Sequence, residues 1–208
     1  MKKDRLWPII SLCTLIIFFL FMHKEELVQK YIRFDKKAEI VMFGDSHVAH
    51  GKWNSTLQSK AVLRYGWPGF TSENLVQKIN DILLFKPKFV FILCGGNDIF
   101  HKDFNPYKTL SNQMKIATKL KQQNIEPVFL ELIHQRGDIS FNLNIDSINT
   151  ILRAYCLNTQ IEIIKMNPIM YDSLGLKATL TTDGLHLNSR GYEILSEKIN
   201  QYLKNKFE

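Results

Sequence analysis

The sequence predicts an α/β fold in which helices cover both faces of a mostly parallel sheet. The alternation of two apolar patterns along the chain predicts this fold, and the length and hydrophobic content agree with it. Short apolar runs typical of buried strands alternate along the chain with longer segments of helical apolar spacing. That alternation is typical of βαβ units, in which a helix returns the chain to the same end of the sheet and the strands lie parallel. The chain has 208 residues, 45% of them hydrophobic, which is enough for one well-cored domain.

The first half of the domain supplies three strands and one helix. Residues 38–43 form an apolar run that ends at a glycine, and residues 61–65 form a second, weaker one. Residues 71–84 repeat apolar side chains at helical spacing, behind a threonine and a serine that can cap a helix. Pro87 ends that helix, and residues 88–94 (KFVFILC) are the clearest strand of the chain.

The second half continues the alternation. Strands are predicted over residues 127–133 and 161–165, where short apolar runs recur. Helices are predicted over residues 112–123, 145–157 and 189–206, the last with a continuous apolar face. No internal repeat, Gly/Ser linker or low-complexity tract interrupts this pattern, so we expect one domain with a five-stranded sheet.

The N-terminus is predicted to anchor the chain in a membrane. Residues 6–22 carry no charge and are dense in Leu, Ile and Phe, and about 17 apolar residues is the short end of what spans a bilayer. The basic residues before this segment predict a single pass, with a cytoplasmic N-terminus and an extracytoplasmic domain. We therefore expect an anchor over residues 1–23, a stalk over 24–37 and the folded domain over 38–208. A cleaved signal peptide is the alternative, although no small-residue cleavage site follows the run.

Composition argues against several classes of protein. The formal net charge is +7, but lysines are scattered among polar residues without an arginine-rich face, so nucleic-acid binding is not predicted. The charge could instead attract an anionic envelope or polysaccharide. Three cysteines cannot build a disulfide scaffold; Cys94 and Cys156 are expected as buried free thiols, with a bridge between them as the alternative. No G-x-G-x-x-G or P-loop follows the first strand, which disfavours a nucleotide-binding module.

Four short stretches carry the groups that nucleophilic catalysis by serine needs. Ser46 follows the first strand through a glycine and an aspartate and could present its hydroxyl as the nucleophile. His186 can take the hydroxyl proton near neutral pH, and Asp183, three residues earlier, can orient the imidazole. Gly69 and Asn97 follow the second and third strands and can donate to an oxyanion, with the backbone N–H of Ser46 as a third donor. Carboxyl ends of parallel strands meet at one edge of a sheet, so one cleft is predicted.

Each stretch also has a simpler interpretation by itself. Ser46 could be only a helix cap, Asp183 could begin a turn, and Gly69 and Asn97 could be turn residues. The occurrence of all four in one order favours catalysis. The remaining histidines lack a metal-ligand spacing, so neither a metal nor a cofactor is predicted. They are expected at the surface or lining the pocket: His47, His50, His101 and His134.

These stretches resemble the four sequence blocks of the SGNH hydrolases, also called GDSL-type esterases and lipases. The family's serine, glycine, asparagine and aspartate–histidine positions fall on Ser46, Gly69, Asn97, Asp183 and His186. The resemblance covers roughly residues 38–206, and Asn149 lies in a segment that looks like a helix of these enzymes. It implies a flavodoxin-like three-layer α/β/α sandwich and a metal-free Ser-His-Asp mechanism.

The chain departs from the family's usual pattern at two places. His47 stands where the family's common name has leucine, and the relatives with histidine there include polysaccharide O-acetyl esterases and transferases. Trp67 and Pro68 add bulk before the glycine of the second block, and Trp67 is expected in the core rather than in the pocket.

The resemblance and the anchor together predict a membrane-anchored serine esterase. It would remove short acyl groups, above all O-acetyl, from envelope or capsular carbohydrate. A polysaccharide O-acetyltransferase with the same three catalytic residues is one alternative, and a non-catalytic glycan-binding protein is another. The expected partners are an acylated small molecule or carbohydrate and, through residues 6–22, the membrane.

Overall fold

The structure, a computed structural model, describes residues 38–58, 61–166 and 169–207. Five parallel strands form its main sheet in the order β2-β1-β3-β4-β5. The strands are β1 (Ile40–Gly44), β2 (Val62–Gly66), β3 (Phe89–Leu93), β4 (Glu126–Leu130) and β5 (Glu162–Ile164). All five predicted strands are present, and the three-layer α/β prediction is confirmed. The strand order reverses between β1 and β3, and in such sheets the carboxyl ends beside the reversal are where ligands bind.

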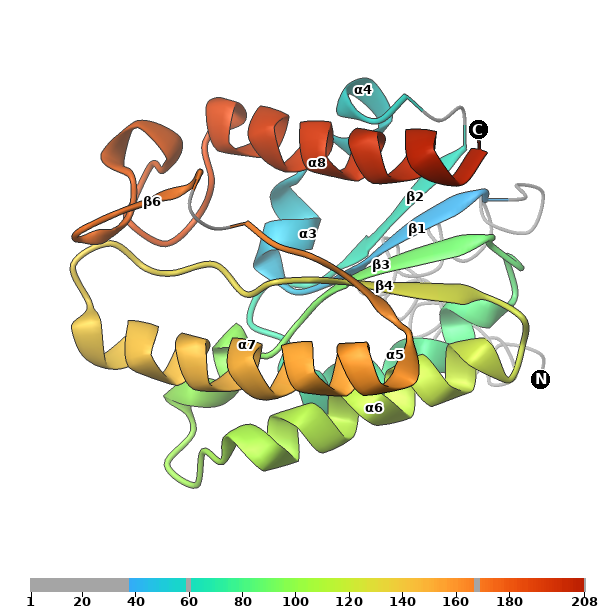
Figure 1. Cartoon of the computed structure of the whole chain (residues 1–208), viewed down its shortest axis with the longest axis horizontal. Helices are drawn as coiled ribbons and strands as arrows, with labels where there is room; N and C mark the ends of the chain where they lie inside the picture. The colour runs from blue at the N-terminus through green and yellow to red at the C-terminus, as the bar shows by residue number, and fades with distance from the viewer. Residues whose placement is uncertain (1–37, 59–60, 167–168, 208) are drawn as a thin grey trace, which may run out of the picture. The chain divides into compact units, whose positions relative to one another are not determined.

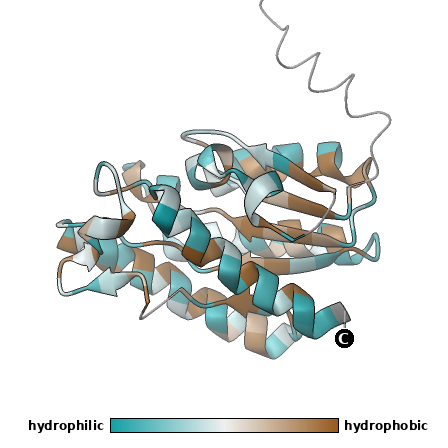
Figure 2. Cartoon of the chain, turned by 90° about the horizontal axis from the view of Figure 1, so that it is seen from above, coloured by the Kyte–Doolittle hydropathy of each residue, from teal (hydrophilic) through white to brown (hydrophobic). Residues whose placement is uncertain are grey.

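Helices cover both faces of the sheet (Figure 1). They are α3 (Ser46–His50), α4 (Trp53–Thr56), α5 (Ser72–Leu83), α6 (Pro106–Lys121), α7 (Ile139–Thr159) and α8 (Ser189–Phe207). Side chains of α3, α4 and α8 pack in one core cluster, and those of α5 and α6 pack in the cluster on the other face. α7 contributes to both clusters. In Figure 2 the strands are mainly hydrophobic, and the helices around them carry both hydrophobic and hydrophilic residues.

Two helices begin earlier than the apolar spacing predicted. The helix predicted over 112–123 starts at Pro106, where the Asn105 side chain accepts the backbone N–H of Tyr107. The helix predicted over 145–157 starts at Ile139, where Asp138 accepts the N–H of Phe141. In both, a polar cap and a partly exposed first turn precede the apolar face, so periodicity alone missed them.

Several short elements were not predicted at all. They are the helices α3 and α4, the 3₁₀ turns η1 (Gly96–Phe100) and η2 (Ala178–Leu180), and the two-stranded ribbon of β6 (Tyr171–Asp172) and β7 (Gly175–Leu176). None is longer than five residues, so none shows a full period of apolar spacing. Two of them, α3 and η1, directly follow strands at the reversal of strand order.

Two glycines allow α3 to pack directly against the ends of β1 and β2. A Cβ atom on Gly44 would lie 2.7 Å from a side-chain carbon of Val48 in α3, and 2.2 Å from the carbonyl oxygen of Leu93 at the end of β3. A Cβ atom on Gly66 would lie 2.5 Å from the backbone nitrogen of Ala49 in α3. Any larger residue would push the helix away from the sheet. The helix that carries Ser46 is therefore seated on the backbone of two adjacent strands.

The cysteines of the described region are both buried free thiols, as predicted. Burial raises the pKa of Cys94 well above its usual range and that of Cys156 to about 12, so both stay protonated. No helix within the described ranges is long and apolar enough to cross a membrane. The predicted anchor over residues 6–22 and the predicted stalk over 24–37 lie outside the described residues and stay predictions.

Asn149 of α7 joins its helix to the end of the central sheet. Its Oδ1 accepts the backbone N–H of Leu132 at 2.9 Å, and its Nδ2 donates to the Leu132 carbonyl at 2.9 Å. The side chain is fully buried. We expect Asn149→Ala to lower the free energy of unfolding by about 2–4 kcal/mol, because both backbone groups lose a buried partner. Denaturant unfolding measures this, with exposed Thr150→Ala as the control; an equal effect in both variants would contradict it.

Candidate active site

Ser46 lies at the N-terminus of α3, at the carboxyl edge of the sheet. β1 ends at Gly44, and Asp45 caps the helix by accepting the backbone N–H of His47 at 3.0 Å. As the first residue of α3, Ser46 has a backbone N–H without a partner inside the helix. The strand, the cap and the helix thus present a hydroxyl and a nearby backbone donor at one point.

His186 contacts both Ser46 and Asp183. Its Nε2 lies 3.0 Å from the hydroxyl oxygen of Ser46, and its Nδ1 lies 2.7 Å from Oδ2 of Asp183. The carboxylate can only accept, so Nδ1 carries the proton and Nε2 is left to accept from the serine. The structure thereby brings together the three side chains predicted from the last and first motifs.

Asp183 is oriented by its own loop. Its Oδ1 accepts the backbone N–H groups of Leu185 at 2.9 Å and of His186 at 2.7 Å, while Oδ2 faces the imidazole. The hydrogen bond from the His186 ring, together with these two backbone bonds, holds the pKa of Asp183 well below its usual range. The carboxylate is therefore ionised at neutral pH and fixes both the tautomer and the direction of the ring.

The loop that carries His186 is held by its backbone as well. Three successive carbonyl oxygens accept hydrogen bonds from three separate parts of the chain. Gly184 accepts from the Arg136 backbone N–H (2.7 Å), Leu185 from His47 Nε2 (3.1 Å) and His186 from the Thr181 hydroxyl (2.7 Å). Hydrogen bonds to the loop backbone and the bond from the His186 ring to Asp183 together hold the imidazole in place.

Asn97 lies on η1, directly after β3. Its Nδ2 donates one hydrogen bond to the carbonyl oxygen of Phe70 at 3.0 Å. An amide nitrogen has two protons, so one remains to donate elsewhere. Asn97 and Ser46 line the same cavity. Gly69 immediately precedes Phe70, so the loop that carries one predicted donor holds the side chain of the other.

The cavity beside Ser46 is small and mostly apolar. Its volume is about 20 Å³, close to the space of one water molecule. Its apolar wall consists of Leu93, Phe100, Leu132, Ile133, Phe141, Ile145 and Leu185. Phe100 is 62% exposed and stacks on Phe141 with ring centroids 5.3 Å apart. An exposed aromatic ring thus borders a narrow pocket that holds the nucleophile.

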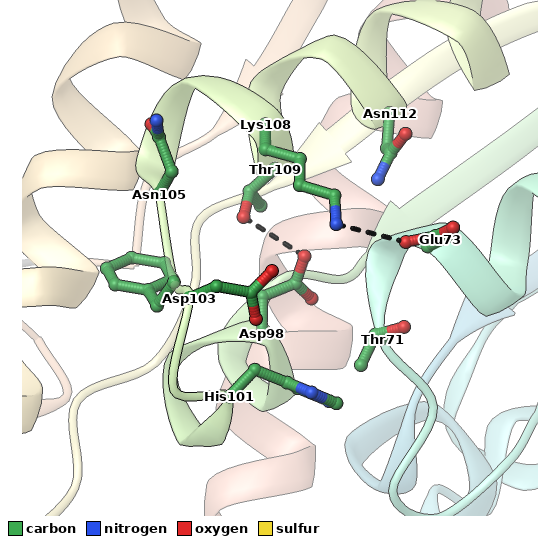
Figure 3. A pocket seen from close by; sticks show the side chains of 10 residues that line it. Thr71, Glu73, Asp98, His101, Asp103, Asn105, Lys108, Thr109 and Asn112 are labelled. Carbon is green, nitrogen blue, oxygen red and sulfur yellow. Dashed lines mark hydrogen bonds and ion pairs between the residues drawn. The ribbon is translucent and has the colours of Figure 1, made fainter.

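A second, polar cavity of about 60 Å³ lies beside η1 and the start of α6 (Figure 3). Asp98 accepts the Thr109 hydroxyl at 3.0 Å and the Ser72 backbone N–H at 2.8 Å, so its carboxylate caps the start of α5. Lys108 pairs with Glu73 at 3.4 Å. These side chains are engaged with one another, and no group of three or more His, Cys, Asp or Glu within the described region could hold a metal ion.

The sequence prediction missed the hydrogen bond that joins His47 to the loop of His186. His47 was expected at the surface or lining the pocket; it does line the pocket, but it is only 8% exposed and bonds to the loop of His186. Burial lowers the pKa of His47, but the hydrogen bond and charge of Asp45 outweigh burial and raise the pKa above its usual value. The one local signal was the capping aspartate two residues earlier.

The other predicted positions fall outside this cavity. Trp67 packs on the core, with its ring stacked on Phe70 at 5.0 Å, as expected. His101 lines the second cavity. His134 pairs with Asp146 at 2.8 Å.

The chain is similar to known proteins in sequence and in fold. A model of the GDSL-like lipase/acylhydrolase family matches residues 42–194. The chain is 27% identical over 190 residues to an N-acylneuraminate cytidylyltransferase of Escherichia coli O18:K1:H7, a match that covers 85% of this chain and 43% of that protein. The chain thus spans less than half the length of this curated relative.

Two solved structures show the same fold. A GDSL-like lipase from Bacteroides thetaiotaomicron superposes with a TM-score of 0.78 at 19% identity, covering 88% of this chain and 98% of that chain. An acetyl xylan esterase superposes with a TM-score of 0.67 at 22% identity, covering 79% and 98%. At these identities the likeness is one of fold.

Gly69 adopts a backbone conformation that side chains disfavour. Its φ is +77°, although a Cβ atom there would meet nothing within 4 Å. We expect Gly69→Ala to lower the free energy of unfolding by about 1–2 kcal/mol through backbone strain alone. Gly96 has equally open surroundings without a positive φ, so Gly96→Ala is the matched control and should change stability by at most about 0.5 kcal/mol. Equal losses on denaturant unfolding would contradict the strain argument.

Proposed function

The chain belongs to the GDSL-like lipase/acylhydrolase family, and from that premise we propose that it is a serine esterase that removes short acyl groups, above all acetyl, from carbohydrate. One observation carries the proposal. The Ser46 hydroxyl, the His186 ring and the Asp183 carboxylate form a continuous relay with bonds of 3.0 and 2.7 Å. This is the geometry that general-base activation of a serine requires.

In the proposed first step, Ser46 attacks the ester carbonyl. His186 takes the hydroxyl proton at Nε2, and the ionised Asp183 stabilises the imidazolium that forms. The backbone N–H of Ser46, the side chain of Asn97 and the backbone N–H of Gly69 would donate to the oxyanion. His186 then returns the proton to the leaving alcohol, which leaves an acyl group on Ser46.

In the second step, water takes the place of the alcohol. His186 removes a proton from water as it attacks the acyl carbonyl, the same donors hold the second oxyanion, and the ester bond to Ser46 breaks. The proton returns to the serine hydroxyl, and a carboxylic acid leaves. Both steps use the ester, water and groups of the chain itself.

The size of the cavity supports a short acyl group. The enclosed space of about 20 Å³ beside Ser46 favours a small acyl group, and closely packed side chains such as Leu93 and Phe141 form its walls.

Two findings support a carbohydrate as the alcohol. The curated relative is named for an N-acylated sugar, and one structural neighbour is named an acetyl xylan esterase. The net charge of +7 would favour an anionic polymer. We do not extend cytidylyl transfer to this chain, because the match covers only 43% of that relative. We further propose that residues 6–22 anchor the protein in a membrane, with the esterase domain on the extracytoplasmic side.

Ester hydrolysis by the full chain should depend on Ser46 and on acyl length. We expect kcat/KM for p-nitrophenyl acetate to exceed that for p-nitrophenyl octanoate by at least about 10-fold, since each extra methylene adds apolar bulk that the cavity cannot hold. Ser46→Ala should lower kcat at least about 10³-fold and abolish labelling by a fluorophosphonate.

The control for this test is Ser55→Ala, at an exposed serine of α4. Full activity in Ser46→Ala would refute the mechanism, and an unlabelled wild type would indicate a non-catalytic binding protein. Transfer of acetyl to a sugar hydroxyl, detected as an acetylated product, would assign the chain as a transferase.

Asn97 should contribute to the transition state rather than to substrate binding. We expect Asn97→Ala to lower kcat by about 10²–10³-fold with little change in KM, because only the developing oxyanion needs its free amide proton. Steady-state kinetics measure both parameters, and exposed Asn54→Ala is the control. A rise in KM at constant kcat would instead make Asn97 a ground-state binding residue.

A further inference from the structure

The hydrogen bond between His47 Nε2 and the carbonyl oxygen of Leu185 joins two segments that are 138 positions apart in the chain. His47 directly follows Ser46, and Leu185 directly precedes His186. We call this bond the His47 brace. The leucine that the resembled family usually has at this position could not make it, because leucine has no donor.

The ring of His47 has a hydrogen bond at one nitrogen atom and a carboxylate near the other. A carbonyl oxygen only accepts, so Nε2 must carry a proton toward Leu185. Nδ1 faces Oδ1 of Asp45 at 3.5 Å, and the same oxygen accepts the backbone N–H of His47 at 3.0 Å. Asp45 therefore lies at ion-pair distance from the second ring nitrogen, while the hydrogen bond that directs the ring is the one to Leu185.

The brace is the direct bond from the helix of Ser46 to the backbone of the loop of His186. Of the three donors to consecutive loop carbonyls, Arg136 follows β4 and Thr181 precedes the loop itself. His47 alone among these three lies on α3. The brace thus runs parallel to the bond between Ser46 and His186, one residue away on each side.

We propose that His47 is a positioning residue, whose bond to Leu185 holds the imidazole of His186 at reacting distance from Ser46. The inference rests on the proposed esterase function. His47 would not touch the reacting atoms; it would set the 3.0 Å separation of the two groups that do. A displacement of about 1 Å at such a pair can lower the rate about 10²-fold.

Proximity to His186 alone does not distinguish His47. The ring of His50 lies 5.1 Å from that of His186, compared with 5.5 Å for His47, and it sits on the same helix. His50 is exposed and has no hydrogen bond to the loop among the described residues. His50 is therefore a matched control that separates the brace from mere nearness of a second imidazole.

The test compares His47→Leu, His47→Gln and His47→Asn in the full chain. We expect His47→Leu to lower kcat for p-nitrophenyl acetate by about 10–100-fold with KM changed by less than about threefold. The side-chain nitrogen of glutamine can approach the place of Nε2 and that of asparagine cannot, so Gln should recover kcat to within about fivefold of wild type and Asn should not. His50→Leu should cost less than about twofold. Thermal unfolding checks that each variant is folded.

The rate of phosphonylation of Ser46 by a fluorophosphonate is measured in parallel, since it reports the relay without an ester substrate. If the wild type hydrolyses esters and His47→Leu matches it, the brace is wrong and the esterase stands. If the wild type hydrolyses no ester but is labelled, and His47→Leu slows labelling at least tenfold, the brace stands and the esterase is wrong. Equal damage in folded Gln and Asn variants would also overturn the brace, as would an unlabelled wild type. If His47→Leu does not fold, the Gln and Asn comparison decides.

Discussion

The close packing of α3 against the ends of β1 and β2 is the constraint on which the site depends. Gly66 has no room for a side chain against the backbone of Ala49, and Gly44 has none against the Val48 side chain, so α3 lies directly on the ends of both strands. Because the interior is closely packed, this contact fixes the height and direction of the first turn. Ser46 therefore lies at the carboxyl edge of the sheet, in a position that the packing of α3 determines. The other groups of the site are arranged around this proposed nucleophile.

Apolar and polar contacts make separate contributions to this arrangement. The two core clusters hold the helices on the sheet, but hydrophobic packing is not directional and does not align hydrogen bonds. Alignment comes from polar side chains that bond to backbone at the sheet edge. Asn149 holds the end of β4, Asn97 bonds to the loop before α5, and His47 bonds to the loop of His186. Each of these side chains thus ties its own helix or turn to the backbone of a neighbouring segment at the sheet edge.

The sequence predicted what depends on local pattern. The five strands were predicted from buried apolar runs. Ser46, Asp183 and His186 were predicted from the spacing of the motifs, and the last two, which are hydrogen-bonded, are only three positions apart in the chain. What it missed depends on contacts between distant segments. The brace of His47 joins residues separated by 138 positions, and nothing near position 47 specifies its partner. Short elements such as α3 and η1 were missed because five residues contain too little periodicity.

The bond between Ser46 and His186 spans 140 positions, so nucleophile and base come from opposite ends of the folded domain. A ribosome releases the segment with Ser46 long before the one with His186. The backbone of α3 is further tied to α8 by the Tyr192 hydroxyl, which donates to the His47 carbonyl at 2.7 Å. Under the proposed mechanism, a nascent or truncated chain that ends before His186 would carry Ser46 without its base. If Ser46 is the nucleophile, its reactivity would report that the segments from both ends of the domain have come together.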